Sequence, residues 1–491
     1  MIAVALVLVP ILIGLGLYAL PRGAVDAARA AAAVIAGLSV VAVIADPHAA
    51  DASLHWLARP FDASFHLGYG PVSYWLVLLL AVVTFSAVLT IRGDRGRELA
   101  AQLLVLQGAM NGVFLAKDLL LFALFWDLML LPVFLVLIGS STHARAAWKY
   151  LIYNLVGGLA LLLATAAFGV VAGSTDVIGN TAAHPAIGMV WGTWIFAGFA
   201  FAFLVKTPVF LFHTWMPDTY AELPPAAVAV VSAVQSKAGL YGFLVITLPL
   251  LAPEMAQAKT LMFVLGSIAL VYGALAALAQ RDAKRVVAYS SLSHLGLILL
   301  ACFSGSVLAY SGAVVYMVAH GLFSAALFLT LGAVEMREET RDLRRLGGLG
   351  ARNPRLAGAL MLGALAALGL PGLAGFAGEI LILTGLFKAG WTVAAVVALL
   401  PVVLASAYML RLFQGIMNGP EVPDLPERRD LTWLEGLALA PLIAAFVWLG
   451  INPSAVVALS ASGAAATPPA AILSAESVRT HSEASRVAVA R

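Results

Sequence analysis

The chain has very little charge and almost no cysteine. Only 11% of its 491 residues are Asp, Glu, Lys or Arg, whereas a soluble domain carries about 25%. The net charge of +3 gives no indication of a nucleic-acid partner. The single cysteine, Cys302, excludes an internal disulfide and an all-cysteine iron–sulfur cluster. Because the sequence also has no Walker lysine loop and no CxxC pair, we expect no cofactor and no metal in this chain.

Long apolar runs fill most of the sequence instead. Hydrophobic residues make up 62% of the chain, and a helix needs about 20 apolar residues to cross a hydrocarbon core. Hydropathy predicts fourteen such spans, centred near residues 11, 37, 82, 107, 129, 160, 203, 238, 269, 294, 320, 371, 403 and 442. We therefore predict an all-α polytopic membrane protein.

Basic residues are distributed unevenly between the loops. Loops after odd-numbered spans hold eighteen Lys and Arg residues, whereas loops after even-numbered spans hold four: Arg59, Lys117, Lys259 and Lys388. Positively charged loops stay in the cytoplasm, so the odd loops are expected to be cytoplasmic and both termini to lie outside.

Two predicted spans contain breaks, Pro208 in the seventh and Pro371 with neighbouring glycines in the twelfth. Proline removes a backbone donor and interrupts a helix, and broken helices at corresponding places in two halves indicate inverted repeats. The expected parts are helices 1–3 over 1–97, a first repeat (helices 4–8) over 98–251, a second, inverted repeat (helices 9–13) over 252–418, the helix 14 region over 419–470 and a polar tail over 471–491.

Ionisable residues occur inside the apolar spans, where a charge costs roughly 2.5–3.5 kcal/mol on insertion scales. Asp127 stands in the middle of LLLFALFWDLMLLPVFLVLIG, and six more are spread over other spans: Lys206, His213, Lys237, His294, His320 and Glu379. His213, near Trp215 and Asp218, is equally well explained as a residue at the membrane interface. A single histidine can also be an ordinary hydrogen-bonded core residue. The whole set, with both signs of charge, favours an array of buried ion pairs and proton-relay groups.

Asp127 and Lys206 suggest how such an array works. Burial favours the neutral form of a lysine, whereas a nearby carboxylate favours the charged form. If Asp127 approaches Lys206 the lysine keeps its proton, and if the acid moves away or is protonated the lysine releases it. Asp127 is therefore predicted to be the counter-ion of Lys206.

Five segments together resemble the antiporter-like proton-pumping subunits of respiratory complex I, most of all subunit M of bacterial NADH–quinone oxidoreductase: FWDLMLLP, KTPVFLFHTWMPD, RDAKRVVAYSSLSHLG, MVAHGLFSAALF and GLPGLAGFAGE. The resemblance covers about residues 60–450. It implies a membrane-arm subunit of the bacterial inner membrane that moves protons, coupled to quinone reduction elsewhere in the complex. The implied partners are the neighbouring membrane subunits, and the implied relay residues are Asp127, Lys206, Lys237, His294, His320 and Glu379.

Two features depart from this family pattern. The family's fifth-helix carboxylate is normally a glutamate, and the shorter Asp127 lengthens any contact with Lys206. The stretch ELPPAAVAVVSAVQSKAGLYGF looks partly like multisubunit cation/proton antiporters and membrane-bound hydrogenases, which remain alternative parent complexes. A membrane scaffold that no longer pumps is a third interpretation, but a scaffold has no need of the buried charges at Lys206, Lys237 and Glu379.

Overall fold

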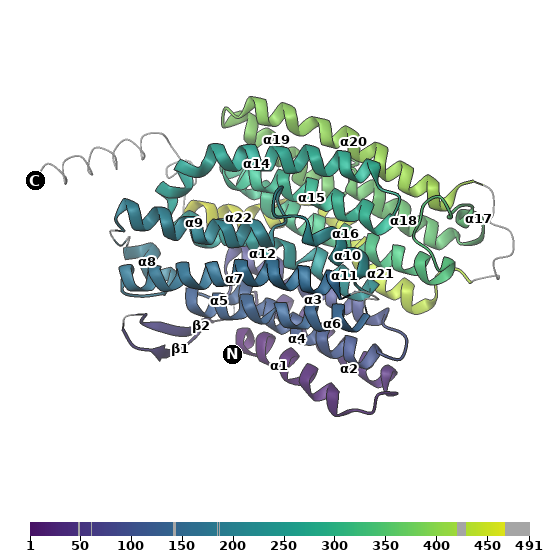
Figure 1. Ribbon diagram of the computed structural model, residues 1–491, viewed down its shortest axis with the longest axis horizontal. Coiled ribbons are helices and arrows are strands. Elements are labelled where there is room, and N and C mark those ends of the chain that lie inside the picture. Colours follow the sequence, from purple (N-terminus) through teal and green to yellow (C-terminus); the bar gives the residue numbers. More distant parts are fainter. Residues whose placement is uncertain are drawn as a thin grey trace, which may run out of the picture.

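The computed structural model describes residues 1–466, apart from 48–49, 60, 141–143, 184, 186 and 420–428. Thirteen helices in this part of the chain are long and apolar enough to cross a membrane. They lie side by side in one bundle (Figure 1). The predicted all-α polytopic membrane fold is therefore confirmed. The predicted tail over 471–491 lies outside the described residues.

Each predicted span coincides with helical structure. The first six are α1 (Ile2–Gly16) with η1 (Leu17–Ala19), α2 (Val25–Ala45), α3 (Pro71–Leu89), α4 (Gly96–Leu115), α5 (Leu119–Leu128) with α6 (Leu130–Ser140), and α7 (Arg145–Ala172). The next five are α9 (Met189–Lys206), the interrupted helix over Pro225–Leu250, α14 (Ala252–Ala279), α15 (Ala283–Cys302) and α16 (Val307–Glu338). The last three are α18 (Pro354–Ala367) with α19 (Ala374–Lys388), α20 (Thr392–Met417) and α21 (Trp433–Ile451). Shorter helices are α8 (Val177–Ala183), α10 (Trp215–Glu222), α17 (Leu349–Arg352) and α22 (Ser454–Ala466).

Both breaks predicted from proline are present. In the twelfth span, α18 and α19 are separated by a loop in which Gly369 and Gly372 have φ angles of +77° and +92°. Residues other than glycine rarely adopt that backbone conformation, so glycine is required where the chain leaves α18. In the seventh span, α9 ends at Lys206, and irregular backbone around Pro208 leads to α10.

A third break, in the eighth span, was not predicted. This span is divided into α11 (Pro225–Ala233), a 3₁₀ turn η2 (Gln235–Lys237), α12 (Ala238–Gly242), a π-helical turn η3 (Phe243–Thr247) and α13 (Leu248–Leu250). No proline marks the break at Val234, where φ is −129°. The carbonyl oxygen of Ser232 accepts hydrogen bonds from the side chains of Ser236 and Lys237 there. Side-chain donors thus replace part of the regular helical bonding.

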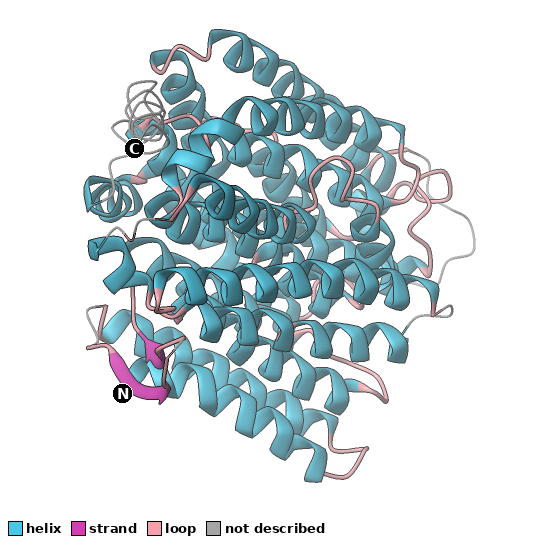
Figure 2. Ribbon diagram, turned by 60° about the vertical axis from the view of Figure 1, so that its left-hand side comes forward, coloured by secondary structure: helices cyan, strands magenta, loops and turns pink. Residues whose placement is uncertain are grey.

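A short antiparallel hairpin of β1 (Ala52–Leu57) and β2 (Ala63–Leu67) was also not expected (Figure 2). It lies between α2 and α3 in the sequence, and the amide of Lys117 donates to the carbonyl of His66 at its end. The hairpin therefore covers the end of the bundle where α4 gives way to α5.

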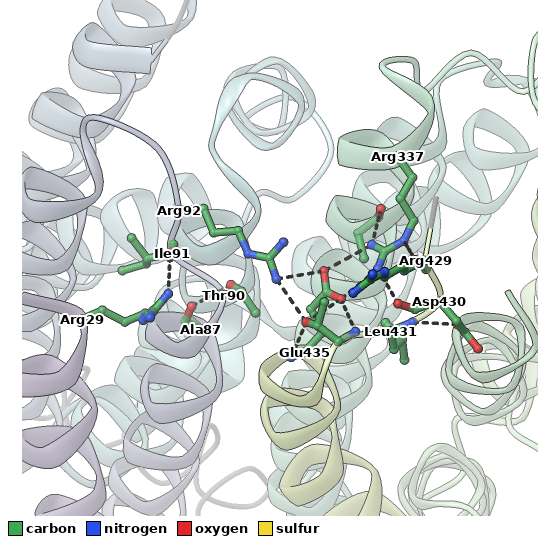
Figure 3. A network of polar contacts seen from close by, with 12 residues as sticks. Arg29, Ala87, Thr90, Ile91, Arg92, Arg337, Arg429, Asp430, Leu431 and Glu435 are labelled. Carbon is green, nitrogen blue, oxygen red and sulfur yellow. Dashed lines mark hydrogen bonds and ion pairs between the residues drawn. The ribbon is translucent and has the colours of Figure 1, made fainter. Parts of the chain in front are cut away.

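We call the other end of the bundle, which carries Arg92, Arg337 and Arg341, the arginine-rich end. Arg92 and Arg337 meet there at Glu435, the first-turn acid of α21 (Figure 3). Arg337 makes two contacts to that carboxylate, of 2.9 and 3.2 Å, and both side chains are buried. This ion-pair cluster joins the loop after α3 and the end of α16 to the start of α21.

A second set of ion pairs at the arginine-rich end joins other helices. Asp218 on α10 contacts Lys149 of α7 and Arg285 of α15, each at 2.8 Å. The arginine-rich loops are thus held together by pairs that link helices far apart in the sequence.

Candidate functional site

All six predicted relay residues lie inside the helical bundle. Asp127 is on α5, Lys206 is the last residue of α9, and Lys237 closes the η2 turn of the broken eighth span. The other three are on continuous segments: His294 on α15, His320 on α16 and Glu379 on α19. Five are buried, with Lys237 and His320 fully so, and Asp127 is half-buried. The helix α16, which bears His320, is the most deeply buried of the candidate membrane spans, and its apolar stretch is entirely buried.

Lys237 is the best-connected member of the set. Its Nζ lies 2.6 Å from the carbonyl oxygen of Ser232, 3.3 Å from the hydroxyl of Ser236 and 2.6 Å from Nδ1 of His320. A protonated lysine can only donate, so His320 Nδ1 is then an acceptor and the ring hydrogen lies on Nε2. A neutral lysine has a lone pair that can accept a hydrogen from Nδ1. One proton can therefore occupy either side of this contact.

His294 continues the connection from His320. The two rings have centroids 5.4 Å apart and are nearly perpendicular. Nδ1 of His294 and Nε2 of His320 are both buried without a hydrogen-bond partner among the described atoms. Unpartnered polar atoms in a buried position are rare, and they mark places where a proton or a water molecule can be received.

A tyrosine that the sequence analysis did not identify joins the histidines to Glu379. The hydroxyl of Tyr316 donates to Oε1 of Glu379 at 2.6 Å, and its ring lies 5.7 Å from that of His294. Tyr316 precedes His320 by four residues on α16, which places both on one face of the helix. That four-residue spacing was the available signal, but a single tyrosine in an apolar span is typical of an ordinary core residue.

The predicted pair Asp127 and Lys206 does not form a direct contact. Their charges interact, but no ion pair of 4.0 Å or less joins them, and Oδ1 of Asp127 and Nζ of Lys206 have no hydrogen-bond partner in the described structure. Lys206 Nζ lies 5.2 Å from the centre of the Trp126 ring. The Asp127 carboxylate lies against Gly158 of α7, where a side chain would leave it no room. Neither charged group is therefore fixed in place by an ion pair or hydrogen bond with the other.

Lys206 has a second electrostatic partner in its own helix. It is the final residue of α9, and the carboxyl end of a helix carries a partial negative charge that favours a cation. The break after α9 ends the helix at this lysine, so the helix dipole acts on it directly. Gly239 in α12 allows close approach here, because a side chain at that position would collide with the backbone of Phe203.

Gln235, which was also not predicted, lies between the two lysines in sequence. Its Nε2 donates to the hydroxyl of Tyr150 at 2.9 Å and to the carbonyl oxygen of Met129 at 3.4 Å, two residues after Asp127. Its Oε1 has no partner in the described structure. The polar run Gln–Ser–Lys inside an apolar span was the signal that could have identified it.

His213 does not join this set. It lies in the irregular segment between α9 and α10, with its ring stacked on Phe210 and edge-on to Tyr272. We therefore leave it outside the candidate relay. Among the described residues, no group of three or more His, Cys, Asp or Glu side chains could hold a metal ion.

Known proteins share this architecture. Residues 116–405 match the family described as the transmembrane part of NADH:quinone oxidoreductase/Mrp antiporter. The chain is 36% identical over 411 residues to NADH-quinone oxidoreductase subunit M of Rhodobacter capsulatus, covering 80% of each protein. It is similar to a chain of respiratory complex I from Thermus thermophilus, with a TM-score of 0.87 and 30% identity over 96% of this chain and all of that one. A chain of the Mrp complex from Dietzia sp. DQ12-45-1b shares the fold, with a TM-score of 0.85 at 21% identity over 96% of this chain and 99% of that one.

Proposed function

The chain belongs to the NADH:quinone oxidoreductase/Mrp antiporter transmembrane family, and we propose that it is a proton-translocating membrane-arm subunit of an NADH–quinone oxidoreductase. The observation that carries this proposal is the line of contacts from Lys237 through His320, His294 and Tyr316 to Glu379. It crosses the bundle from the broken eighth span to the broken twelfth span. Groups that bind and release protons in a buried line are what a proton pathway requires.

In the proposed mechanism, Asp127 and Lys206 set the charge at one end of the line. A proton on Lys206 is stabilised by the carboxylate of Asp127 and by the end of α9. Because no direct bond holds the pair, a small movement of α5 or α9 changes how strongly Lys206 keeps its proton. We propose that a positive charge on Lys206 in turn disfavours one on Lys237, because like charges repel each other more strongly in a low-dielectric interior.

Lys237 then passes its proton to His320 across the 2.6 Å contact. The imidazole accepts at Nδ1 and releases at Nε2, which has no other described partner. The centroids of the His320 and His294 rings are 5.4 Å apart, and no hydrogen bond joins the two rings in the described structure. The proton therefore reaches His294 by ring rotation or through a bridging water. Glu379 receives it beside the break in the twelfth span. Irregular backbone at membrane depth is tolerated where it lines a water-filled cavity, so this break is a suitable exit.

We further propose the organisation that the sequence predicts. Residues 98–251 and 252–418 form the two inverted repeats, with the arginine-rich end in the cytoplasm and both termini outside. The chain carries no redox group, and electron transfer takes place in other subunits of the complex. Conformational or electrostatic changes driven by quinone reduction reach Asp127 and Lys206 through the neighbouring membrane subunits, which are its partners.

Purification of the tagged chain from its native membrane in mild detergent tests the assignment. We expect peripheral subunits that oxidise NADH to co-purify, together with NADH-dependent quinone reduction. Recovery with small antiporter subunits and no NADH oxidation would instead make the chain part of a cation/proton antiporter. Recovery with hydrogenase subunits would make the chain part of a membrane-bound hydrogenase, the other alternative parent complex.

A further inference from the structure

Among the described residues, one short side-chain bond holds Glu379 inside the bundle. Its Oε1 accepts from the hydroxyl of Tyr316 at 2.6 Å, and both side chains are buried. The other carboxylate oxygen lies against Gly369, in the loop that separates α18 from α19. The acid therefore has a tyrosine on one side and the break of the twelfth span on the other.

The bond depends on a close approach between α16 and α19. A side chain at residue 378 would place its Cβ 2.6 Å from Cβ of Tyr316, so only glycine fits at Gly378. The neighbouring residue, Glu379, is thereby brought within hydrogen-bond distance of α16. This packing holds the carboxylate in register with the tyrosine, and it does so without help from the histidines.

Two positions on α16 connect the broken eighth span to the broken twelfth span. His320 contacts Lys237 of the eighth span, and Tyr316 contacts Glu379 of the twelfth span. The two positions are four residues apart, which is a rise of about 6 Å along the helix. The ring of His294 lies beside both, 5.4 Å from His320 and 5.7 Å from Tyr316. Any route from the histidines to Glu379 along these contacts passes the Tyr316 hydroxyl.

We propose that the hydroxyl of Tyr316 passes protons between the histidine pair and Glu379, an inference that rests on the proposed function. Once ring rotation brings a nitrogen of protonated His294 to the Tyr316 oxygen, that nitrogen gives it a proton while the original hydroxyl proton moves to Oε1 of Glu379. One N–H bond and one O–H bond break, and one O–H bond forms on each acceptor. His294 and Glu379 both become neutral, and Tyr316 is neutral before and after the step.

The test uses Tyr316→Phe, Glu379→Gln and the double variant in the intact complex, in sealed vesicles. Phenylalanine keeps the ring against His294 and removes only the hydroxyl. Coupled NADH oxidation and proton uptake should fall at least about tenfold in Tyr316→Phe. This loss is smaller than the roughly 100-fold that a positioned proton-transfer group contributes to its own step, because other steps also limit the coupled rate. The solvent deuterium isotope effect should rise, because that proton step becomes limiting.

The double variant separates a relay role from a structural one. If Tyr316 acts through Glu379, the double variant is no slower than Glu379→Gln alone. Tyr310→Phe is the matched control, since Tyr310 is also buried on α16 but lies outside the relay, and it should keep parent-level turnover. Unchanged subunit composition of each complex shows that the variants assemble.

Three results would overturn the inference. Parent-level turnover in Tyr316→Phe, with Glu379→Gln impaired, rejects the role of Tyr316 and leaves the proposed function intact. Additive losses with an unchanged isotope effect assign Tyr316 to packing alone. Parent-level pumping in Glu379→Gln rejects the relay through Glu379, and with it the proposed mechanism as well as this inference.

Discussion

Lys237 Nζ and His320 Nδ1 lie 2.6 Å apart in the middle of the bundle, and this contact joins the eighth span to the eleventh. The two residues are 83 positions apart in the sequence and both are fully buried. The lysine reaches the histidine from a 3₁₀ turn, where the helix is interrupted. The break in the eighth span therefore places one proton-binding group directly against another.

Replacing Lys237 by methionine should abolish transfer to His320 while keeping a side chain of similar length. We expect coupled proton uptake to fall at least about tenfold, because a positioned proton-transfer group contributes roughly 100-fold to its own step. The measurement is NADH-driven proton uptake in sealed vesicles. Lys259→Met is the control, since Lys259 of α14 lies outside the relay beside Trp391, and it should behave as the parent. Equal activity of both variants would reject the role of Lys237.

The negative charge at residue 127, and not the exact length of that side chain, should control how strongly Lys206 holds its proton. A unit charge more than 4.0 Å away changes an ionisation by up to about 4 kcal/mol at an effective dielectric of 20. We therefore expect Asp127→Asn to reduce proton uptake about tenfold or more, whereas Asp127→Glu should retain at least about half of it. Rates of proton uptake and quinone reduction, measured together, compare the two variants. An active Asp127→Asn would mean that Asp127 is not the counter-ion.

The ion pair between Arg337 and Glu435 should be important for stability. Removing one partner of a buried pair costs about 3–5 kcal/mol when the other charge is left without a partner, and Glu435 would keep only the longer contact to Arg92, at 3.5 Å. Arg337→Met should therefore lower the thermal unfolding midpoint of the purified complex. The solvent-exposed Arg344, which pairs with Asp342, supplies the control, and Arg344→Ala should leave the unfolding midpoint close to that of the parent. Similar midpoints for the two variants would contradict this account.

Asp430 should make the start of α18 sensitive to acid. Burial alone raises the pKa of this carboxyl, but the backbone amides of Arg355, Leu431 and Leu356, with the charge of Arg355, outweigh it and lower the pKa below its ordinary value. A lowered pKa means that the stabilisation is complete above the unfolded-state pKa of about 3.9 and is lost as the pH falls through the folded-state value.

Asp430→Ala should accordingly unfold at a lower temperature than the parent at pH 6, by an amount that corresponds to about 0.5–2 kcal/mol for a lost helix cap. The two midpoints should converge as the pH falls through the lowered folded-state pKa of Asp430. Thermal unfolding of both proteins across this range measures the difference. A gap that stays constant with pH would show that the carboxylate charge has no part in holding α18.

The sequence was sufficient to predict the spans and the breaks in the seventh and twelfth of them. Hydropathy identifies every span because each needs about 20 apolar residues, and Pro208 and Pro371 carry their own signal for an interruption. The break at Val234 has no such signal. It depends on Lys237 reaching the carbonyl oxygen of Ser232 and the ring of His320, which are tertiary contacts that local sequence does not specify.

The sequence predicted the ionisable residues of the candidate relay but not the neutral tyrosine among them. Asp127, both lysines and Glu379 stand out because ionisable groups are rare inside a membrane span. Tyr316 does not, since a neutral tyrosine in an apolar run resembles core. Only the fold brings α19 against α16 and reveals its bond to Glu379.

Lys206→Ala in the intact complex tests the central claim most directly. The measurement records quinone reduction and proton uptake together in sealed vesicles, after the subunit composition has been checked. If Lys206 belongs to a coupled relay, both activities fall while the complex still assembles. If electron transfer and the proton gradient both persist at parent levels, the charges of Asp127 and Lys206 are structural and the proposed mechanism is wrong.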